Sequence, residues 1–182
     1  MRVIHVNSSP HPSLLPQGEK EHITVFCGAN TKKYINLILF LVLLDQFTKY
    51  LVRKNLILGQ TVFVNSFFNI SYITNTGIAF GMFKNANAFF AVFTVVFLIL
   101  FAVYFKKNKD NLSTIIKTAF MLIFAGALGN LVDRLTQGHV IDFLDFHIKD
   151  YYWPSFNVAD SCISIGGVIL FLSLLKSDKN VE

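Results

Sequence analysis

The sequence of 182 residues is poor in the residue types that build disulfide, haem and most metal sites. Its two cysteines, Cys27 and Cys162, lie in very different settings and give neither a disulfide framework nor a paired metal-ligand spacing. All five histidines fall outside the long apolar runs. A haem or a His-Glu-x-x-His metal site inside a helical bundle is therefore not supported.

Charge is also scarce. Charged residues make up 15% of the chain, whereas 53% is hydrophobic and the mean hydropathy is +0.52. This composition excludes an ordinary soluble domain of this length and indicates an integral membrane protein. The net charge of +5 does not indicate nucleic-acid binding, because the lysines cluster beside apolar runs and no nucleic-acid-binding motif accompanies them.

Four apolar runs predict an all-α membrane protein with four transmembrane helices, at about residues 34–52, 88–105, 114–132 and 158–175. Residues 61–64 and 67–73 are β-branched and aromatic, which predicts a small extracytoplasmic β element between the first two helices. The expected organisation is a mobile cytoplasmic tail over 1–31, a four-span domain over 32–176 and a cytoplasmic tail over 177–182.

The basic residues beside the apolar runs favour placing both termini in the cytoplasm. Asp133 and Asp160 then lie at the outer face of the membrane. The basic residues expected on the cytoplasmic side are Lys32, Lys33, Lys106, Lys107, Lys109, Lys117, Lys176 and Lys179. Those expected on the other side are Arg53, Lys54, Lys84, Arg134 and Lys149.

Asp133 ends the third apolar run and Asp160 opens the fourth, so the two carboxylates are expected at similar depth. Two close carboxylates share one proton, which is the chemistry of aspartic proteases. The alternative is that Asp133 pairs with Arg134 and Asp160 caps its helix, and this choice stays open. Ser161 is not a favoured nucleophile, since we see no intramembrane His or Lys as its base.

Other features have both a structural and a functional interpretation. Asp45 lies within the first span, where it either hydrogen-bonds a neighbouring helix or acts in catalysis. The segment 75–81 is either an ordinary hairpin or an edge that pairs with an extended peptide. Gly126 and Gly129 predict a small-residue face for close helix packing.

The motifs together resemble those of the bacterial lipoprotein signal peptidases, the signal peptidase II family. The resemblance covers residues 32–176 and departs from the family at Ile78, where a small residue is usual. The matching segments are Asp45-Gln46-x-Thr48-Lys49, Asn75-x-Gly77-x-Ala79-Phe80-Gly81, Gly126-x-x-Gly129-Asn130-x-x-Asp133-Arg134, Gly138-x-Val140-x-Asp142-Phe143 and Phe156-Asn157-x-Ala159-Asp160.

This resemblance implies an aspartic endopeptidase of the cytoplasmic membrane, without metal or cofactor. Its substrates would be prolipoproteins modified with diacylglycerol, and the cut would fall just before the lipidated cysteine. By position, Asp133 and Asp160 match the catalytic dyad. The other matching positions are Asn130, Arg134 and Asn157, which line the site; Asn75 and Gly77, which meet the substrate; Phe80, which helps cover it; and Asp45, which supports the site.

The partners implied are the prolipoprotein and membrane lipid, with the enzyme acting as a monomer. One rival is a proton-coupled transporter using Asp45, Asp133 and Asp160 as a relay, which the absence of internal repeats weakens. Another is a membrane assembly factor without catalytic activity. If either predicted dyad residue tolerates replacement by Asn, Asp45 and Asp142 are the next candidates.

Overall fold

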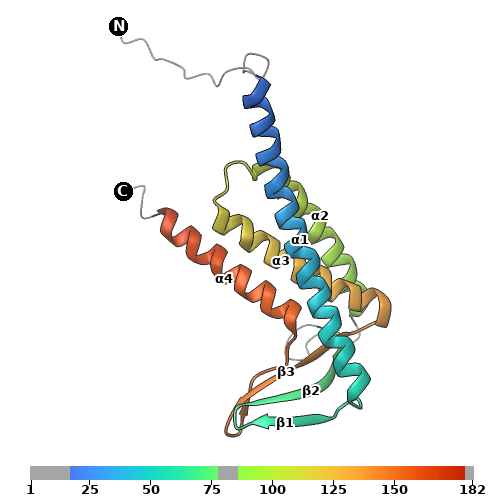
Figure 1. Cartoon of the computed structure of the whole chain (residues 1–182). Coiled ribbons are helices and arrows are strands. Elements are labelled where there is room, and N and C mark those ends of the chain that lie inside the picture. The colour runs from blue at the N-terminus through green and yellow to red at the C-terminus, as the bar shows by residue number, and fades with distance from the viewer. Residues whose placement is uncertain (1–16, 78–85, 179–182) are drawn as a thin grey trace. The chain divides into compact units, whose positions relative to one another are not determined.

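The computed structural model describes residues 17–77 and 86–178. Its contacts divide the chain into two compact units, Met1–Asn36 and Leu37–Glu182, which we describe separately. The elements are α1 (Gln17–Asn55), β1 (Thr61–Asn65), β2 (Phe68–Asn75), α2 (Asn87–Asn108), α3 (Thr114–Gln137), β3 (Val140–Ile148), β4 (Tyr151–Tyr152) and α4 (Val158–Asp178), as Figure 1 shows.

The first unit holds the start of α1, which is helical from Gln17. The sequence prediction placed residues 1–31 in a tail, so the helix extends further toward the N-terminus than expected.

Helices occupy all four predicted apolar runs. Three of them are long and apolar enough to cross a membrane, at Lys32–Asn55, Asn87–Asn108 and Thr114–Gln137, and α4 carries a shorter apolar stretch over Val158–Ser173. Large apolar side chains cover their outer faces, as with Phe89 at 64% exposure. Such broad apolar surfaces are typical of membrane contact.

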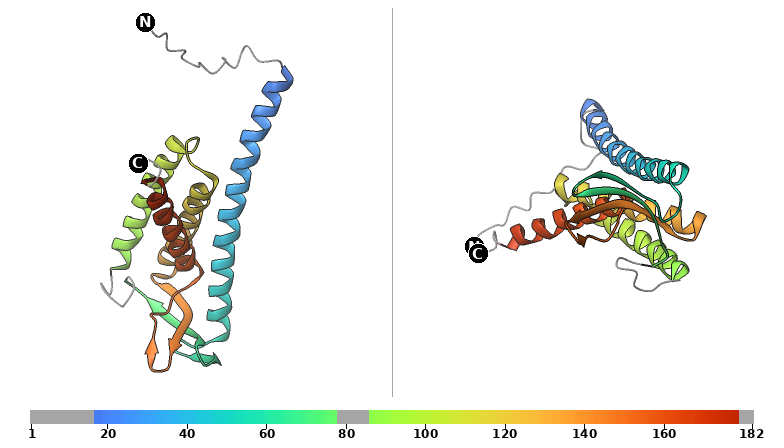
Figure 2. Two further views of the ribbon diagram at one scale, coloured as in Figure 1. Left: turned by 90° about the vertical axis from the view of Figure 1, so that its left-hand side faces the viewer. Right: turned by 90° about the horizontal axis from the view of Figure 1, so that it is seen from below.

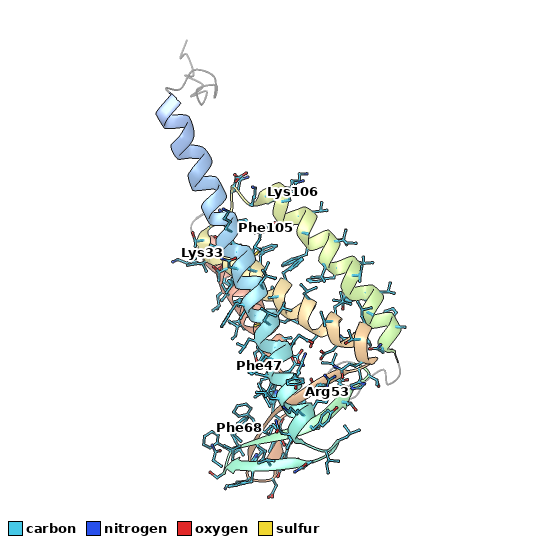
Figure 3. All side chains as sticks on the ribbon, turned by 45° about the vertical axis from the view of Figure 1, so that its right-hand side comes forward. Lys33, Phe47, Arg53, Phe68, Phe105 and Lys106 are labelled. Atoms are coloured by element: carbon cyan, nitrogen blue, oxygen red, sulfur yellow. The ribbon has the colours of Figure 1, made fainter. Side chains whose placement is uncertain are left out.

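The ends of α2 illustrate how the apolar helices are bounded. Phe105 and Lys106 lie at the end of α2 far from the sheet, whereas Phe68 lies on the sheet itself (Figure 3). Lys106 and Lys107 form a basic last turn, as the sequence predicted.

Helices α3 and α4 pack in close contact at small residues. A Cβ atom at Gly126 would collide with the backbone oxygen of Ala159 on α4, and one at Gly129 would lie 2.8 Å from Asp45 Oδ2. The predicted small-residue face is therefore confirmed, and it brings the start of α4 against the end of α3.

The boundaries of α3 and α4 follow from their capping residues. Gly138 ends α3 in the left-handed conformation with φ of 76°, which glycine adopts without a steric penalty. At the start of α4, the Asp160 amide donates to Asn157 Oδ1 at 2.9 Å and the Asn157 amide donates to Asp160 Oδ2 at 3.2 Å. This reciprocal pair is a capping box.

The sheet is larger than predicted. Its four antiparallel strands follow the order β1-β2-β3-β4, so strands from between α3 and α4 extend the hairpin from between α1 and α2 (Figure 2). The prediction of a β element confined to the first loop was therefore incomplete. The reason is that residues 140–143 are all buried, so β3 lacks the alternation of apolar and polar residues that reveals a strand.

Candidate active site

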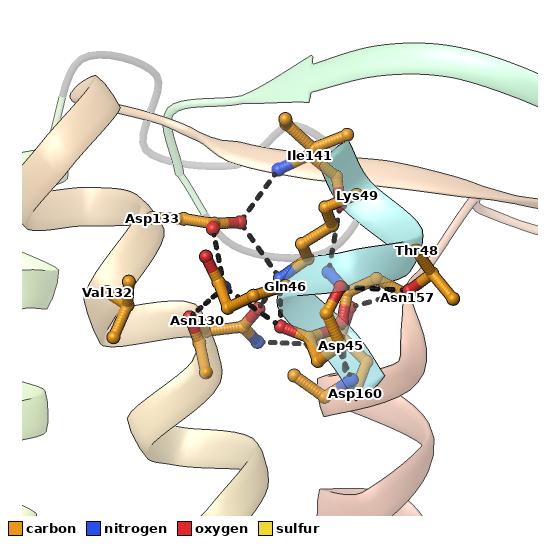
Figure 4. A network of polar contacts seen from close by, with 12 residues as sticks. Asp45, Gln46, Thr48, Lys49, Asn130, Val132, Asp133, Ile141, Asn157 and Asp160 are labelled. Atoms are coloured by element: carbon orange, nitrogen blue, oxygen red, sulfur yellow. Dashed lines mark hydrogen bonds and ion pairs between the residues drawn. The ribbon is translucent and has the colours of Figure 1, made fainter. Parts of the chain in front are cut away.

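Three charged side chains form a buried cluster between α1 and α3. Lys49 Nζ lies 2.8 Å from Asp45 Oδ2 and 2.8 Å from Asp133 Oδ2 (Figure 4). All three residues are at most 1% exposed. Buried charges persist only when they are paired, and one ammonium group here serves two carboxylates.

The remaining oxygens of the cluster accept hydrogen bonds. Gln46 Nε2 donates to Asp133 Oδ1 at 2.9 Å, and the Ile141 amide donates to Asp133 Oδ2 at 3.3 Å. Asp45 Oδ1 accepts from the Ala159 amide at 2.9 Å. Asp45 therefore ties α1 to the first turn of α4, and Asp133 ties α3 to the start of β3.

Asp142 on β3 lies beside a different set of groups. Asn157 Nδ2 donates to Asp142 Oδ1 at 2.8 Å, and Asn75 Nδ2 donates to Asp142 Oδ2 at 3.1 Å. The antiparallel register pairs Asn75 with Val140, which brings the end of β2 next to this carboxylate.

Asn157 donates hydrogen bonds to two carboxylates, those of Asp142 and Asp160. Its side-chain amide donates to Asp142, and its backbone amide donates to Asp160. Asn130 adds a third donor, with Nδ2 lying 2.7 Å from Asp160 Oδ1, while its own Oδ1 accepts from Lys49 Nζ at 3.1 Å. A continuous chain of contacts thus runs from the buried ammonium to Asp160.

Burial, and secondly the negative charge of Asp160, raise the pKa of Asp142 from 3.8 to about 7. The hydrogen bonds from Asn75 and Asn157 and the charge of Lys49 oppose this rise. A carboxyl with such a pKa retains its proton over much of the range near neutrality. Asp142 and Asp160 are therefore suited to hold one proton between them.

Both of these carboxylates line a pocket of about 900 Å³. Much of its lining is apolar and comes from α2, α3 and α4, including Phe93, Phe97 and Ile123. Among the described residues that line it, neither Asp45 nor Asp133 occurs. Five carboxylates of the described residues are buried or partly buried: Asp45, Asp133, Asp142, Asp145 and Asp160. Of these, only Asp142 and Asp160 line a space that a substrate could enter.

Comparison with known proteins identifies the family. Residues 37–176 match the model of the family described as Signal peptidase (SPase) II. A lipoprotein signal peptidase from Thermodesulfovibrio yellowstonii is 46% identical over 76% of this chain and 92% of its own length. One from Alteromonas mediterranea is 41% identical over 77% of this chain and 79% of its own.

The chain belongs to the signal peptidase II family. A solved bacterial membrane enzyme, determined by the in meso method at 2.3 Å, has a TM-score of 0.76 and 37% identity and covers 83% of this chain and 92% of its own. A second, at 1.9 Å, has a TM-score of 0.71 and 38% identity over 80% of this chain and 94% of its own. The family resemblance drawn from the motifs is therefore confirmed, and the protein is a membrane enzyme of a peptidase family.

Most positions carried over from the signal peptidase II motifs gather at the pocket. These are Asn75, Gly77, Asn130, Arg134 and Asp160, all of which line it. Asn157 lies behind them and is fully buried, and Phe80 falls outside the described residues. Asp133 and Asp45 do not line the pocket, because both are bound to Lys49 in the buried ion cluster.

Arg134 lies at the side of the pocket. Its Nη2 donates to the Gly77 carbonyl oxygen at 3.5 Å, and its guanidinium carbon lies 5.9 Å from the centre of the Phe90 ring. Arg134 therefore links α3 to the segment after β2. Among the described residues, the ion-pair partner of Asp133 is Lys49 and not this adjacent arginine.

Gln46 and Lys49 stand in the first matching motif, but the sequence alone assigned them no role, and the structure places both against Asp133. Lys49 lies in the first span, is 1% exposed and pairs with Asp45 and Asp133. Its position four residues after Asp45 was the available signal, because residues at this spacing meet on one helix face. Within the described residues, no group of three or more His, Cys, Asp or Glu side chains is placed to hold a metal ion.

Proposed function

We propose that this protein is an aspartic endopeptidase that removes the signal peptide from prolipoproteins modified with diacylglycerol, cutting just before the lipidated cysteine. The observation that carries the proposal is the pair of pocket-lining carboxylates, Asp142 and Asp160, joined through Asn157. Family membership supports the peptidase class, and the apolar pocket wall supports a lipid-bearing substrate.

The proposed dyad is Asp142 with Asp160, in place of the predicted Asp133 with Asp160. Asp133 is completely buried, accepts hydrogen bonds from two groups and is neutralised by Lys49. These contacts occupy the oxygens that a catalytic base would need. Asp142 was named from the sequence only as a fallback, and its place on the pocket wall now makes it the better candidate.

The reaction would begin with a water molecule between the two carboxyl groups. The ionised member of the pair accepts a proton from this water, whose oxygen attacks the carbonyl carbon of the scissile peptide bond. The protonated member donates its proton to the carbonyl oxygen, giving a neutral tetrahedral diol. Collapse of the diol breaks the carbon–nitrogen bond, and the amine of the lipidated cysteine leaves with a proton returned by the pair.

Asn130 and Asn157 would fix the geometry of this step. Each donates an N–H group to Asp160, and Asn157 also donates to Asp142, so both carboxyl planes are set by amides that do not titrate. Lys49 supplies positive charge behind Asn130. Preorganised donors of this kind lower the cost of charge movement in the transition state.

The membrane placement that fits this reaction has four spans, with α4 as the fourth. Both termini would lie in the cytoplasm, and the pocket at the extracytoplasmic face of the inner membrane. The acyl chains of the substrate could then stay in the apolar part of the pocket while water reaches the dyad. Because the described chain holds all the residues of this mechanism, we propose that a monomer suffices.

The test is cleavage of a diacylglyceryl-modified prolipoprotein by the purified protein in detergent, with the unlipidated precursor as the comparison. The proposal predicts a cut before the lipidated cysteine and slow or absent cleavage of the unlipidated form. Equal cleavage of both forms would show that the lipid is not recognised. Proton flux in liposomes without peptide would instead support the transporter alternative.

A further inference from the structure

Among the described residues that line the pocket, one hydroxyl group on a helix has no hydrogen-bond partner in the protein. Three hydroxyl side chains on helices line the pocket: Thr94 on α2 and Ser161 and Ser164 on α4. Thr94 donates to the Phe90 carbonyl at 2.7 Å, and Ser161 donates to the Asn157 carbonyl at 2.9 Å. Within the described residues, Ser164 Oγ has no hydrogen-bond partner and its side chain is exposed.

This absence is physically informative because of where Ser164 lies. Serine and threonine in apolar helices commonly satisfy their hydroxyl on the carbonyl four residues earlier, as Ser173 does on Ile169 at 2.7 Å. Ser164 does not do so, although its neighbours on the pocket wall include Ile163 and Ile165. The Ser164 hydroxyl is therefore available to donate a hydrogen bond to a ligand in the pocket.

The distance from the dyad fits a particular part of the substrate. Ser164 follows Asp160 by four residues, so it lies on the same face of α4, about 6 Å further along the helix axis. In a diacylglyceryl cysteine, the glycerol ester groups lie a few bonds beyond the sulfur, on the same side of the scissile bond as the acyl chains. With the scissile carbonyl at Asp160, these esters would lie beside Ser164.

We infer that the Ser164 hydroxyl donates a hydrogen bond to an ester carbonyl of the diacylglyceryl group and thereby helps select the lipidated substrate. This inference rests on the proposed function. An ester carbonyl accepts hydrogen bonds strongly, whereas the acyl chains beyond it need only the apolar wall. Ser164 is therefore a specificity residue and not a catalytic one, because it does not touch the reacting atoms.

The experiment compares a lipopeptide carrying ester-linked chains with the same peptide carrying ether-linked chains, which lack the carbonyl acceptor. The kcat/KM of each is measured in detergent for the parent, Ser164→Ala and Ser164→Thr. Loss of one such hydrogen bond predicts a decrease of roughly 3- to 10-fold for Ser164→Ala on the ester substrate, and no change on the ether substrate. Ser164→Thr retains the hydroxyl and should keep the ester preference.

Ser173→Ala is the matched control, because this serine lies on the same helix and its hydroxyl is bound to the backbone. It should cleave both substrates as the parent does. Equal rates of Ser164→Ala and parent on the ester substrate would overturn the inference, and so would an equal loss on both substrates, which would indicate packing. Failure of the parent to cleave either lipopeptide would instead overturn the proposed function on which the inference rests.

Discussion

Lys49 Nζ lies 2.8 Å from Asp133 Oδ2 in a position where neither side chain is more than 2% exposed. This contact joins the first helix to the third. It also neutralises the charge of Asp133, the carboxylate that the motif alone had assigned to the catalytic dyad. It also explains how a lysine is tolerated within a span, since the ammonium is surrounded by carboxylate and amide oxygens.

Removing the ammonium should be more damaging than removing a charge at the surface. Lys49→Met leaves Asp45 and Asp133 buried without their cation, and breaking a buried pair in this way costs on the order of 3–5 kcal/mol. We expect a lower melting temperature in detergent and little cleavage activity. Lys107→Met is the control, because Lys107 is exposed in the last turn of α2. This variant should have the same melting temperature as the parent. Equal stability of the two variants would contradict the role given to the cluster.

The rate of cleavage should fall as the pH rises through about 7. The pKa of Asp142 is raised to about 7 from 3.8, so the carboxyl holds its proton below this pH and loses it above. Loss of the proton leaves two neighbouring carboxylates and no acid for the carbonyl oxygen. The measurement is kcat against pH between 5 and 9, with melting curves at each pH. A rate that rises steadily to pH 9 while the protein stays folded would rule out this assignment.

Helix packing beside the dyad gives a prediction about glycine. Gly126→Ala places a methyl group against the backbone oxygen of Ala159, which cannot move aside without shifting the first turn of α4. Overpacking of this kind costs roughly 1–3 kcal/mol, and because Asp160 is the next residue, activity should fall too. Gly167→Ala is the matched control, since a Cβ there meets nothing within 4 Å. The measurements are the melting temperature and the cleavage rate of both variants. Equal values for Gly126→Ala and Gly167→Ala would contradict the prediction.

Several features followed from local sequence patterns. The apolar runs predicted the helices, and the β-branched segments predicted β1 and β2. The glycines at 126 and 129 predicted a close helix contact, and the structure shows that the partner is α4. Each of these depends on residues close together in the chain. The capping alternative for Asp160 was also correct, although the same carboxylate faces the pocket as well.

Other features depend on contacts that no local pattern contains. Whether Asp133 or Asp142 faces the pocket is decided by Lys49, which is distant in sequence, and by the turn at Gly138, which redirects the chain into β3. The pairing of β2 with β3 likewise joins segments separated by two helices. Both carboxylates stand in motifs, so the motifs alone could not distinguish a buried partner of lysine from a pocket residue.

The most direct test of this account compares Asp133→Asn, Asp142→Asn and Asp160→Asn on a diacylglyceryl-modified prolipoprotein, using equal amounts of folded protein. Asn preserves the shape of each side chain but removes its ionisable oxygen. We predict that Asp142→Asn and Asp160→Asn remain folded and fall to background, a loss on the order of 10⁴-fold or more. Asp133→Asn should melt at a lower temperature, because Lys49 loses a partner, yet retain measurable cleavage. Background activity in a fully stable Asp133→Asn, together with cleavage by Asp142→Asn, would contradict the account and return catalysis to Asp133.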